Sequence, residues 1–429
     1  MQADQVLERS ASAHREAGDR PAPPPDKAFV RPAQAAKPRA VQLFVHHDLA
    51  ELEREWRRFE QIAHCTPFQS FNWLSAWQRH VGVRTNTRPA IVIGRSESNE
   101  LLFILPLATR KAGLQTELTF LGSDLCDYNA PLLGPGFAAA VSGDFPSLWN
   151  DIRRMLQKDP QHFHDLTLLE KMPGMIGYVP NPFTELALTL NPSGAYATTL
   201  SGDWETFYAD KRSSSTRRRD RTKRKKLAEN GEVRMVTPEE PREVAATLAV
   251  LLEQKQKAFA RMGVPNIFEK AGYREFFADL TTNPQFTGLA HVSRLDVGEV
   301  FAAANLGLMF RGGYYHVLAS YDDGPLSRFG PGAAHLHELM RYALEHRCTL
   351  FDFTIGDEPY KRDWSDTELK LYDYVEAATW RGAIAAGTVA VGQRAKRAIK
   401  QSERLWPLVM RLRASFGSFR SRLGPSDRA

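Results

Sequence analysis

The chain has 429 residues, more than one hydrophobic core usually organises, so we expect two domains. Apolar residues make up 43% of the chain and aromatic residues 10%, which suffices for buried cores, and no run approaches the roughly 18 to 20 apolar residues of a membrane-spanning helix. Residues 211–226 and 381–422 each carry ten Lys or Arg against one acid, which is a net charge of +9 per segment. Because the whole chain has a net charge of +6, the remaining residues carry −12, which excludes a generally basic fold.

Residues 1–38 are rich in alanine, proline and charged side chains and show neither helical nor strand periodicity. We predict a disordered leader there, without the apolar stretch of a secretory signal. The cysteines Cys65, Cys126 and Cys348 stand far apart with no CxxC spacing, which excludes a disulfide framework and a thiolate zinc site. These features favour the cytoplasm.

The segment 39–190 begins with an apolar strand, VQLFV, followed by a helical pattern with Leu49, Leu52, Trp56 and Phe59 on one stripe. Further predicted elements are a helix near 71–81, a hairpin of strands 89–95 and 101–108, a helix near 145–157 and a strand at 165–170. Prolines and glycines in 171–194 indicate a linker or crossover.

The segment 195–380 repeats this order. Its predicted elements are a long helical region at 204–230, a strand at 231–237, helices at 241–262 and 269–280, strands at 288–295, 300–310 and 314–321, a helix at 333–346 and a strand at 349–356. A Gly-Pro-Gly sequence occurs in both segments, at 134–136 and 330–332. The pattern predicts an α/β fold with mixed sheets, built from two tandem units.

The stretch from Leu318 to Arg347 runs from a strand through a glycine-bearing loop into a helix. Free backbone N–H groups and the helix dipole at such a junction suit a pyrophosphate, and glycine lets phosphates approach closely. We therefore predict a phosphate-binding site, with residues Arg328, Phe329, Gly330, Gly332 and Ala333. The alternative is an ordinary turn before an ordinary helix.

The run SRFGPGAAHLHELMRYALEHRCTLFDFTIGDEPYKRDW, and the earlier LTFLGSDLCDYNAPLL, resemble the CelD/BcsL-type acetyltransferases of the GNAT superfamily. The resemblance implies two tandem GNAT-like units, a layout shared with the Fem-type aminoacyltransferases, and a donor site in the second unit. It also implies acetyl-CoA or another acyl-CoA as donor and no metal. The general GNAT loop pattern is Gln/Arg-x-x-Gly-x-Gly/Ala; this sequence departs from it, with Ser327 at the first position and Arg328 one place later.

Direct acyl transfer needs a base for the acceptor's proton, an N–H that polarises the thioester carbonyl, and an acid for the leaving thiolate. The candidate bases are Asp352, Asp357 and His316, and the candidate acid is Tyr321. The alternation in FDFT places Asp352 opposite two phenylalanines, where burial would raise its pKa. The alternatives are a structural carboxylate for Asp352, turn chemistry for Asp357 and ordinary packing for His316.

Asp127, Tyr128 and Asn129 form a polar group within an apolar stretch, which indicates either hydrogen-bonded structure or a substrate cleft between the units. Lys361 is a candidate clamp for an anionic acceptor or a donor phosphate. We predict no metal site, because the pairs His162/His164 and His335/His337 have i, i+2 spacing and no apparent third ligand.

Residues 211–226 read as a solvated basic helix, or as a contact for anionic lipid, RNA or a phosphorylated sugar carrier. Nucleic acid is the disfavoured partner, because no aromatic residues interleave there. The tail, 381–429, mixes apolar and basic residues, which favours peripheral contact with a membrane or a polysaccharide synthesis complex; packing on the body is the alternative.

Together these features favour an acyl-CoA-dependent N- or O-acyltransferase that acts on a sugar, polysaccharide precursor or cell-envelope metabolite, without a covalent enzyme intermediate. Its expected place is the cytoplasm, peripheral to the inner membrane. A Fem-like transferase with an aminoacyl-tRNA donor and a non-catalytic accessory protein of exopolysaccharide (cellulose) synthesis are the alternatives.

Overall fold

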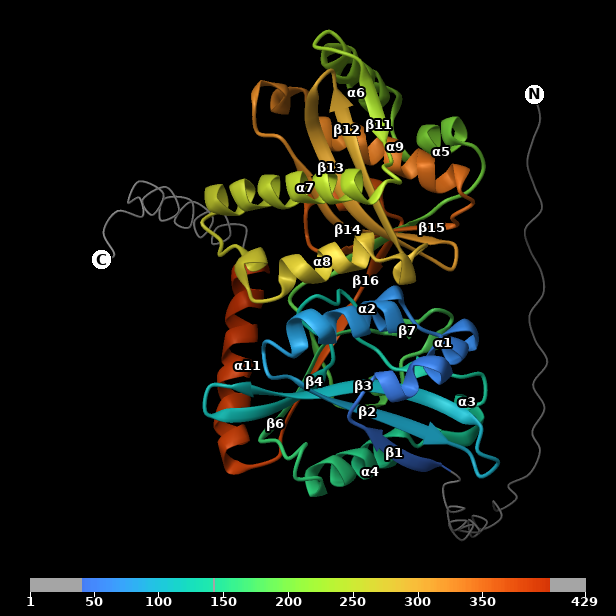
Figure 1. Cartoon of the computed structure of the whole chain (residues 1–429), viewed down its shortest axis with the longest axis vertical. Coiled ribbons are helices and arrows are strands. Elements are labelled where there is room, and N and C mark those ends of the chain that lie inside the picture. The colour runs from blue at the N-terminus through green and yellow to red at the C-terminus, as the bar shows by residue number, and fades with distance from the viewer. Residues whose placement is uncertain (1–40, 142, 402–429) are drawn as a thin grey trace, which may run out of the picture. The chain divides into compact units, whose positions relative to one another are not determined.

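The computed structural model describes residues 41–141 and 143–401. The predicted leader, 1–38, and residues 402–429 of the predicted tail lie outside the described residues. Two mixed β-sheets dominate the described part, one built mainly by each half of the chain (Figure 1).

The first sheet runs through seven strands, with the short strand β5 (Leu132–Leu133) added beside β3. In spatial order its strands are β1 (Gln42–His46), β2 (Arg88–Arg95), β3 (Leu101–Ala112), β4 (Gln115–Phe120), β6 (Leu166–Pro173), β17 (Leu371–Ala377) and β9 (Thr189–Leu190). Its helices are α1 (Glu53–Ile62), α2 (Phe71–Trp77), α3 (Phe137–Val141), α4 (Phe145–Lys158) and α11 (Trp380–Gln401).

The second sheet also has seven strands. In spatial order these are β11 (Val233–Val236), β12 (Ala290–Val297), β13 (Val300–Phe310), β14 (Gly313–Tyr321), β15 (Leu350–Ile355), β10 (Ala195–Thr199) and β16 (Thr367–Leu369). Its helices are α5 (Trp204–Lys211), α6 (Ser214–Ala228), α7 (Pro241–Met262), α8 (Tyr273–Thr282), α9 (Pro331–Glu345) and α10 (Pro359–Trp364). A small hairpin, β7 (Met175–Ile176) and β8 (Val179–Pro180), lies between the two halves in sequence.

Both sheets repeat one pattern of strand pairing. Four strands pair antiparallel in chain order, the fourth pairs in parallel with the fifth, and two antiparallel strands follow. The sixth strand differs in origin, because β10 follows the linker whereas β17 comes from near the end of the described chain. Strand β17 falls within the segment predicted as the second unit, yet it pairs with β6 of the first sheet.

Side-chain alternation along the strands places a different set of helices on each face. Ile91 and Ile93 of β2 pack with α1 and α2, while Val92 between them packs with α4. In the second sheet, Leu306 and Leu308 of β13 belong to the core with α7 and α8, and α9 covers the opposite face over β15. Figure 1 shows α7 crossing one face of the second sheet and α11 running beside the strands of the first.

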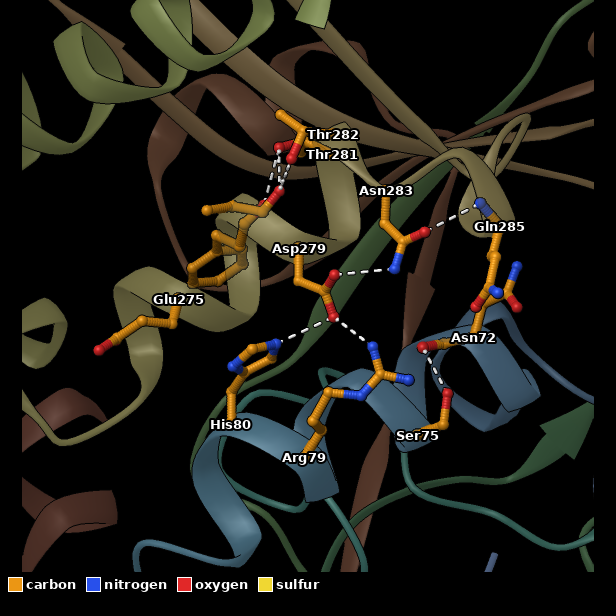
Figure 2. Close-up of polar contacts among 12 residues, drawn as sticks. Asn72, Ser75, Arg79, His80, Glu275, Asp279, Thr281, Thr282, Asn283 and Gln285 are labelled. Atoms are coloured by element: carbon orange, nitrogen blue, oxygen red, sulfur yellow. Dashed lines mark hydrogen bonds and ion pairs between the residues drawn. The ribbon is translucent and has the colours of Figure 1, made fainter. Parts of the chain in front are cut away.

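One apolar core continues from the first half into the second, where α2 faces α8. The rings of Trp73 and Phe276 lie with their centroids 5.0 Å apart. Beside them, Asp279 of α8 accepts hydrogen bonds from Arg79 (3.0 Å), His80 (2.9 Å) and its own neighbour Asn283 (2.9 Å), as Figure 2 shows. Burial opposes charge on Asp279, but the hydrogen bonds from Asn283 and His80 and the charge of Arg79 lower its pKa.

The predicted α/β class with mixed sheets and two tandem units is confirmed. The long helical region predicted at 204–230 is two helices, because Ser213 caps the start of α6 through a bond from the N–H of Thr216. All three cysteines are buried and free. Within 41–141 and 143–401, no helix has both the length and the apolar character needed to cross a bilayer.

Candidate active site

Strands β14 and β15 part from one another in the middle of the second sheet. Their parallel pairing covers three positions and ends at Tyr315 and Asp352. Beyond that point β14 stays paired with β13 as far as Tyr321, and β15 stays paired with β10 as far as Ile355. The backbone on one side of each strand is thereby released from strand pairing beyond that point.

A β-bulge marks the position where the strands part. Leu306 pairs with Leu318 while the next residue, Gly307, pairs with His316, so Val317 is the extra residue of β14. Bulges of this kind re-aim strands and occur next to active sites. Opposite the bulge, Thr354 has a positive φ of 58° and its hydroxyl donates to the His316 carbonyl at 3.2 Å.

The loop after β14 ends in a helix start that no side chain caps. A 3-10 turn, Pro325–Phe329, leads to Gly330, whose φ of 70° is a conformation that favours glycine, and α9 begins at Pro331. The first N–H groups of a helix have no partner within the helix. The backbone of Gly332 and Ala333 is therefore available to an anion at the positive end of α9.

The predicted phosphate-binding residues all lie at this helix start, and Tyr321 lies there too. A Cβ on Gly332 would come within 3.1 Å of the Tyr321 ring, so the half-exposed tyrosine covers the start of α9. Six residues of extended strand, about 20 Å, separate Tyr321 from Tyr315. Tyr321 and Asp352 thus occupy opposite ends of the parted region.

Asp352 lies where the two strands part and is 3% exposed. Its Oδ1 accepts hydrogen bonds from the Tyr128 hydroxyl and from the N–H of Thr354, both at 2.7 Å. In the described part of the chain both bonds end on Oδ1, which leaves Oδ2 to accept a proton. Burial, opposed by the two hydrogen bonds, raises the pKa of Asp352 to about 7, the range a general base needs near neutrality.

Tyr128 comes from the first half of the chain, 224 residues before Asp352. Gln69 fixes the Tyr128 backbone by donating to its carbonyl oxygen at 2.7 Å. Burial and the nearby Asp352 carboxylate raise the pKa of Tyr128 well above its usual value, so its hydroxyl keeps its proton and serves as a hydrogen-bond donor. The Asp352 carboxyl group of the second half is therefore positioned by the Tyr128 hydroxyl of the first half.

Further charged groups surround this pair. Asp127 is partly buried, and burial raises its pKa against the charge of Lys171 and a hydrogen bond with Thr354. Lys361 is 4% exposed; its ammonium donates to the Ile355 carbonyl at 2.7 Å and lies 3.1 Å from Glu358. The cluster thus brings Asp127, Tyr128, Asp352 and Lys361 together, four of the predicted site residues.

Lys255 on α7 is a member of this cluster that the sequence did not suggest. Burial lowers its pKa, while the charges of Glu358 and Asp127 oppose that shift and Lys361 adds to it. In the sequence Lys255 is one of several polar residues of an amphipathic helix, and no local pattern separates it from its solvent-facing neighbours.

Three other predicted site residues, His316, Asn129 and Asp357, are held by hydrogen bonds to other parts of the chain. His316 is buried, and burial lowers its pKa to about 3; with the Asn305 amide in the orientation that satisfies both of its ends, the amide nitrogen donates to His316 Nε2 at 3.1 Å. Asn129 is held by the Glu170 carbonyl at 2.9 Å. Asp357 accepts the N–H of Gly194 at 3.3 Å. The roles predicted for these three stay predictions.

One group of side chains in the described ranges has the composition of a metal site. His47, Asp159 and His162 lie together at the edge of the first sheet. Nδ1 of His47 and Nε2 of His162 are 2.8 Å apart, a hydrogen-bond distance. Two histidine ligands of one tetrahedral zinc would stand about 3.3 Å apart. The pair therefore reads as a hydrogen-bonded couple.

Residues 214–362 match the protein-family model described as an acetyltransferase (GNAT) domain. The matched segment holds β14, the loop, α9 and β15, which are the elements of the parted region. No curated protein matches the chain.

Among solved structures, the chain is similar to FemX, with 10% identity, a TM-score of 0.54, and coverage of 78% of this chain and 97% of that one. It is also similar to a conserved protein of unknown function from Bacteroides thetaiotaomicron, with 12% identity, a TM-score of 0.50, and coverage of 77% and 99%. Identities this low show a shared fold alone. The GNAT match and the parted strands lie in the same segment, so residues 214–362 are the part of the chain that resembles an acetyltransferase domain.

Proposed function

We propose that the chain transfers an acyl group, acetyl in the simplest case, from acyl-CoA to an amine or hydroxyl of a sugar, polysaccharide precursor or cell-envelope metabolite. The observation that supports this most is the parting of β14 and β15 at Asp352, followed by the uncapped start of α9. A thioester donor needs an extended site for its pantetheine arm and a positive site for its diphosphate, and we assign the first to the parted strands and the second to the start of α9.

In the proposed reaction the acceptor attacks the thioester carbonyl directly, and Oδ2 of Asp352 takes the proton from the attacking nitrogen or oxygen. Tyr128 positions the carboxylate through Oδ1. A backbone N–H released on β14 polarises the carbonyl, the new C–N or C–O bond forms and the C–S bond breaks, and coenzyme A leaves as a thiolate that takes a proton from water.

The kind of acceptor is the least constrained part of the proposal. The CelD/BcsL-like sequences at 118–133 and 327–364 support a saccharide or envelope acceptor in exopolysaccharide or cellulose formation. The polar cluster around Asp127 joins residues of both halves, and we propose that it forms the acceptor side of the site. We place the reaction in the cytoplasm, peripheral to the inner membrane, where acyl-CoA is supplied.

A second candidate is transfer from an aminoacyl-tRNA. The observation that favours it is the basic helix α6, which lies against the donor loop rather than away from the body. An RNA acceptor end would need positive charge at that place. The two candidates differ in donor alone, so donor binding separates them.

The test is the thermal stability of the full chain with coenzyme A and acetyl-CoA, comparing Gly332→Glu with Gly136→Glu. Both variants alter the last glycine of a Gly-Pro-Gly sequence, but only Gly332 lies at the start of α9. A carboxylate there would repel the donor's phosphates, so we expect the ligand-induced rise in Tm to vanish in Gly332→Glu and to persist in Gly136→Glu.

The Tm without ligand controls for folding, because a Cβ at position 332 must displace the Tyr321 ring slightly. An equal response of both variants to coenzyme A would refute the donor site, and stabilisation by aminoacyl-tRNA but not by coenzyme A would favour the second candidate.

A further inference from the structure

Helix α6 is anchored to the body along one face. Asp220 accepts the hydroxyl of Tyr208 at 2.9 Å, Arg224 pairs with Glu338 of α9, and Leu227 is fully buried. These residues follow one another at intervals of three or four, so they share one side of the helix. The cations at the intervening positions must therefore point elsewhere.

Those cations line an open groove of about 600 Å³ beside the donor loop. Its lining residues are Ser215, Arg218, Arg219, Thr222, Lys223 and Lys226 of α6, with Arg328 and Phe329 of the loop. The groove contains five cationic side chains and no acidic one. Within 41–141 and 143–401, none of the five takes part in an ion pair, although neighbouring arginines do. Unpaired cations gathered in one concavity favour a polyanion.

The groove reaches the start of α9. Lys223 and Phe329 line both the groove and a small cavity of about 50 Å³ that includes Gly330 and Ala333. The Lys223 ammonium lies 3.9 Å from the place a Cβ on Gly330 would take. An anion bound at the backbone N–H groups of α9 would therefore have the α6 cations as its next neighbours.

We propose that α6 forms the second phosphate subsite of the donor site, in which Arg219, Lys226 and their neighbours bind the 3′-phosphate of the coenzyme A nucleotide. The proposal rests on the proposed function. Coenzyme A carries a diphosphate and a separate 3′-phosphate monoester, and the start of α9 can neutralise only the first. The groove supplies positive charge at a second place, next to the first.

The groove favours a nucleotide over an RNA strand. Binding of single-stranded RNA relies on aromatic side chains on which successive bases stack. Phe329 is the aromatic residue of this groove, and the guanidinium of Arg328 already lies over its ring, 4.7 Å from the centroid. A groove rich in cations and poor in free rings fits phosphate recognition.

The test is calorimetric binding of coenzyme A and of 3′-dephospho-coenzyme A to the full chain. The variants are Arg219→Gln/Lys226→Gln in the groove and, as the matched control, Arg221→Gln/Lys225→Gln outside it. Each removes two positive charges from the same helix, and glutamine has a helix propensity close to that of lysine and arginine. We expect the unaltered chain to prefer coenzyme A by about 10- to 100-fold, the usual range for hydrogen bonds to a charged group.

The groove variant should bind coenzyme A as weakly as 3′-dephospho-coenzyme A, with its affinity for the latter unchanged, while the control variant keeps the preference. Binding of both ligands with equal affinity by the unaltered chain would overturn the subsite but leave the acyl-CoA donor intact. If both variants lost the preference for coenzyme A equally, the net charge of α6 and not a specific site would explain the preference, and the 3′-phosphate subsite would also be overturned. Binding of tRNA but neither coenzyme would refute the acyl-CoA donor itself.

Discussion

Replacing Asp352 by asparagine should separate catalysis from stability. The amide oxygen can still accept from Tyr128 and from the N–H of Thr354, so the local geometry is retained. What is lost is the oxygen that takes the proton. Positioned acid–base catalysis contributes about 10²- to 10⁴-fold, so we expect kcat/KM to fall by that range.

The free energy of unfolding of Asp352→Asn should exceed that of the unaltered chain at neutral and alkaline pH. The pKa of Asp352 is raised by burial from 3.8 to about 7, so the folded chain holds this proton more tightly than the unfolded chain. The penalty is absent below pH 4, grows as the pH rises to 7, and is complete above that. Since one pKa unit corresponds to about 1.4 kcal/mol, asparagine should relieve up to about 4 kcal/mol at pH 8 and less than about 1 kcal/mol at pH 4.

The assay has two parts. Thiol release from acetyl-CoA with a panel of amino sugars reports activity, and Tm measured from pH 4 to pH 8 reports stability. We expect the Tm difference between Asp352→Asn and the unaltered chain to become more positive with rising pH. A variant that keeps its activity and loses Tm at pH 8 would show that Asp352 is a structural carboxylate, and the assignment as base would fail.

Three further predictions concern the residues around this site and the contact between the halves. Tyr128→Phe removes a hydrogen bond that favours the Asp352 anion, so the pKa of Asp352 and the acidic side of the pH profile of kcat/KM should shift to higher pH by about 1 to 2 units. A pH profile without this shift would exclude the positioning role of Tyr128. Gly272→Ala should lower the free energy of unfolding by about 2 to 5 kcal/mol in denaturant titrations, because φ is 85° and the new Cβ would lie 2.0 Å from the His80 carbonyl oxygen. Asp279→Asn should lower Tm at pH 7. Because the pKa of Asp279 is lowered in the folded chain, its carboxylate stabilises the fold above about pH 4, and the difference in Tm should shrink below that pH. A difference in Tm that does not depend on pH would contradict the ion-pair argument.

Much of the fold follows from local patterns. The hairpin predicted at 89–95 and 101–108 is β2 and β3, and the three strands before the glycine loop are β12, β13 and β14. Their alternation and tight turns are signals within one segment. Strand β17 had no such signal, because its pairing with β6 joins residues about 200 positions apart.

The site was predictable where one segment contains it. The loop at Gly330 and the alternation around Asp352 were visible in sequence, since both depend on neighbours within a few residues. The pairing of Tyr128 with Asp352 was not, although both were candidates, because each sequence segment gives no information about the other. The same holds for α6: composition identified its charge, but only packing places Lys223 beside Gly330.

The tandem layout has a chemical consequence, because neither half contains the complete site. The proposed base, Asp352, lies on β15 of the second sheet, and the Tyr128 hydroxyl that hydrogen-bonds to it lies in a loop of the first half. The first half is in turn held by the second: Asp373 of β17 accepts the N–H of Lys171 at 2.9 Å, and Lys171 donates to the carbonyl of Cys126, two residues before Tyr128. Strand β17 therefore links the end of the second half to the segment that orients Asp352, so under the proposed function the first half would contribute to catalysis although the proposed donor site belongs to the second.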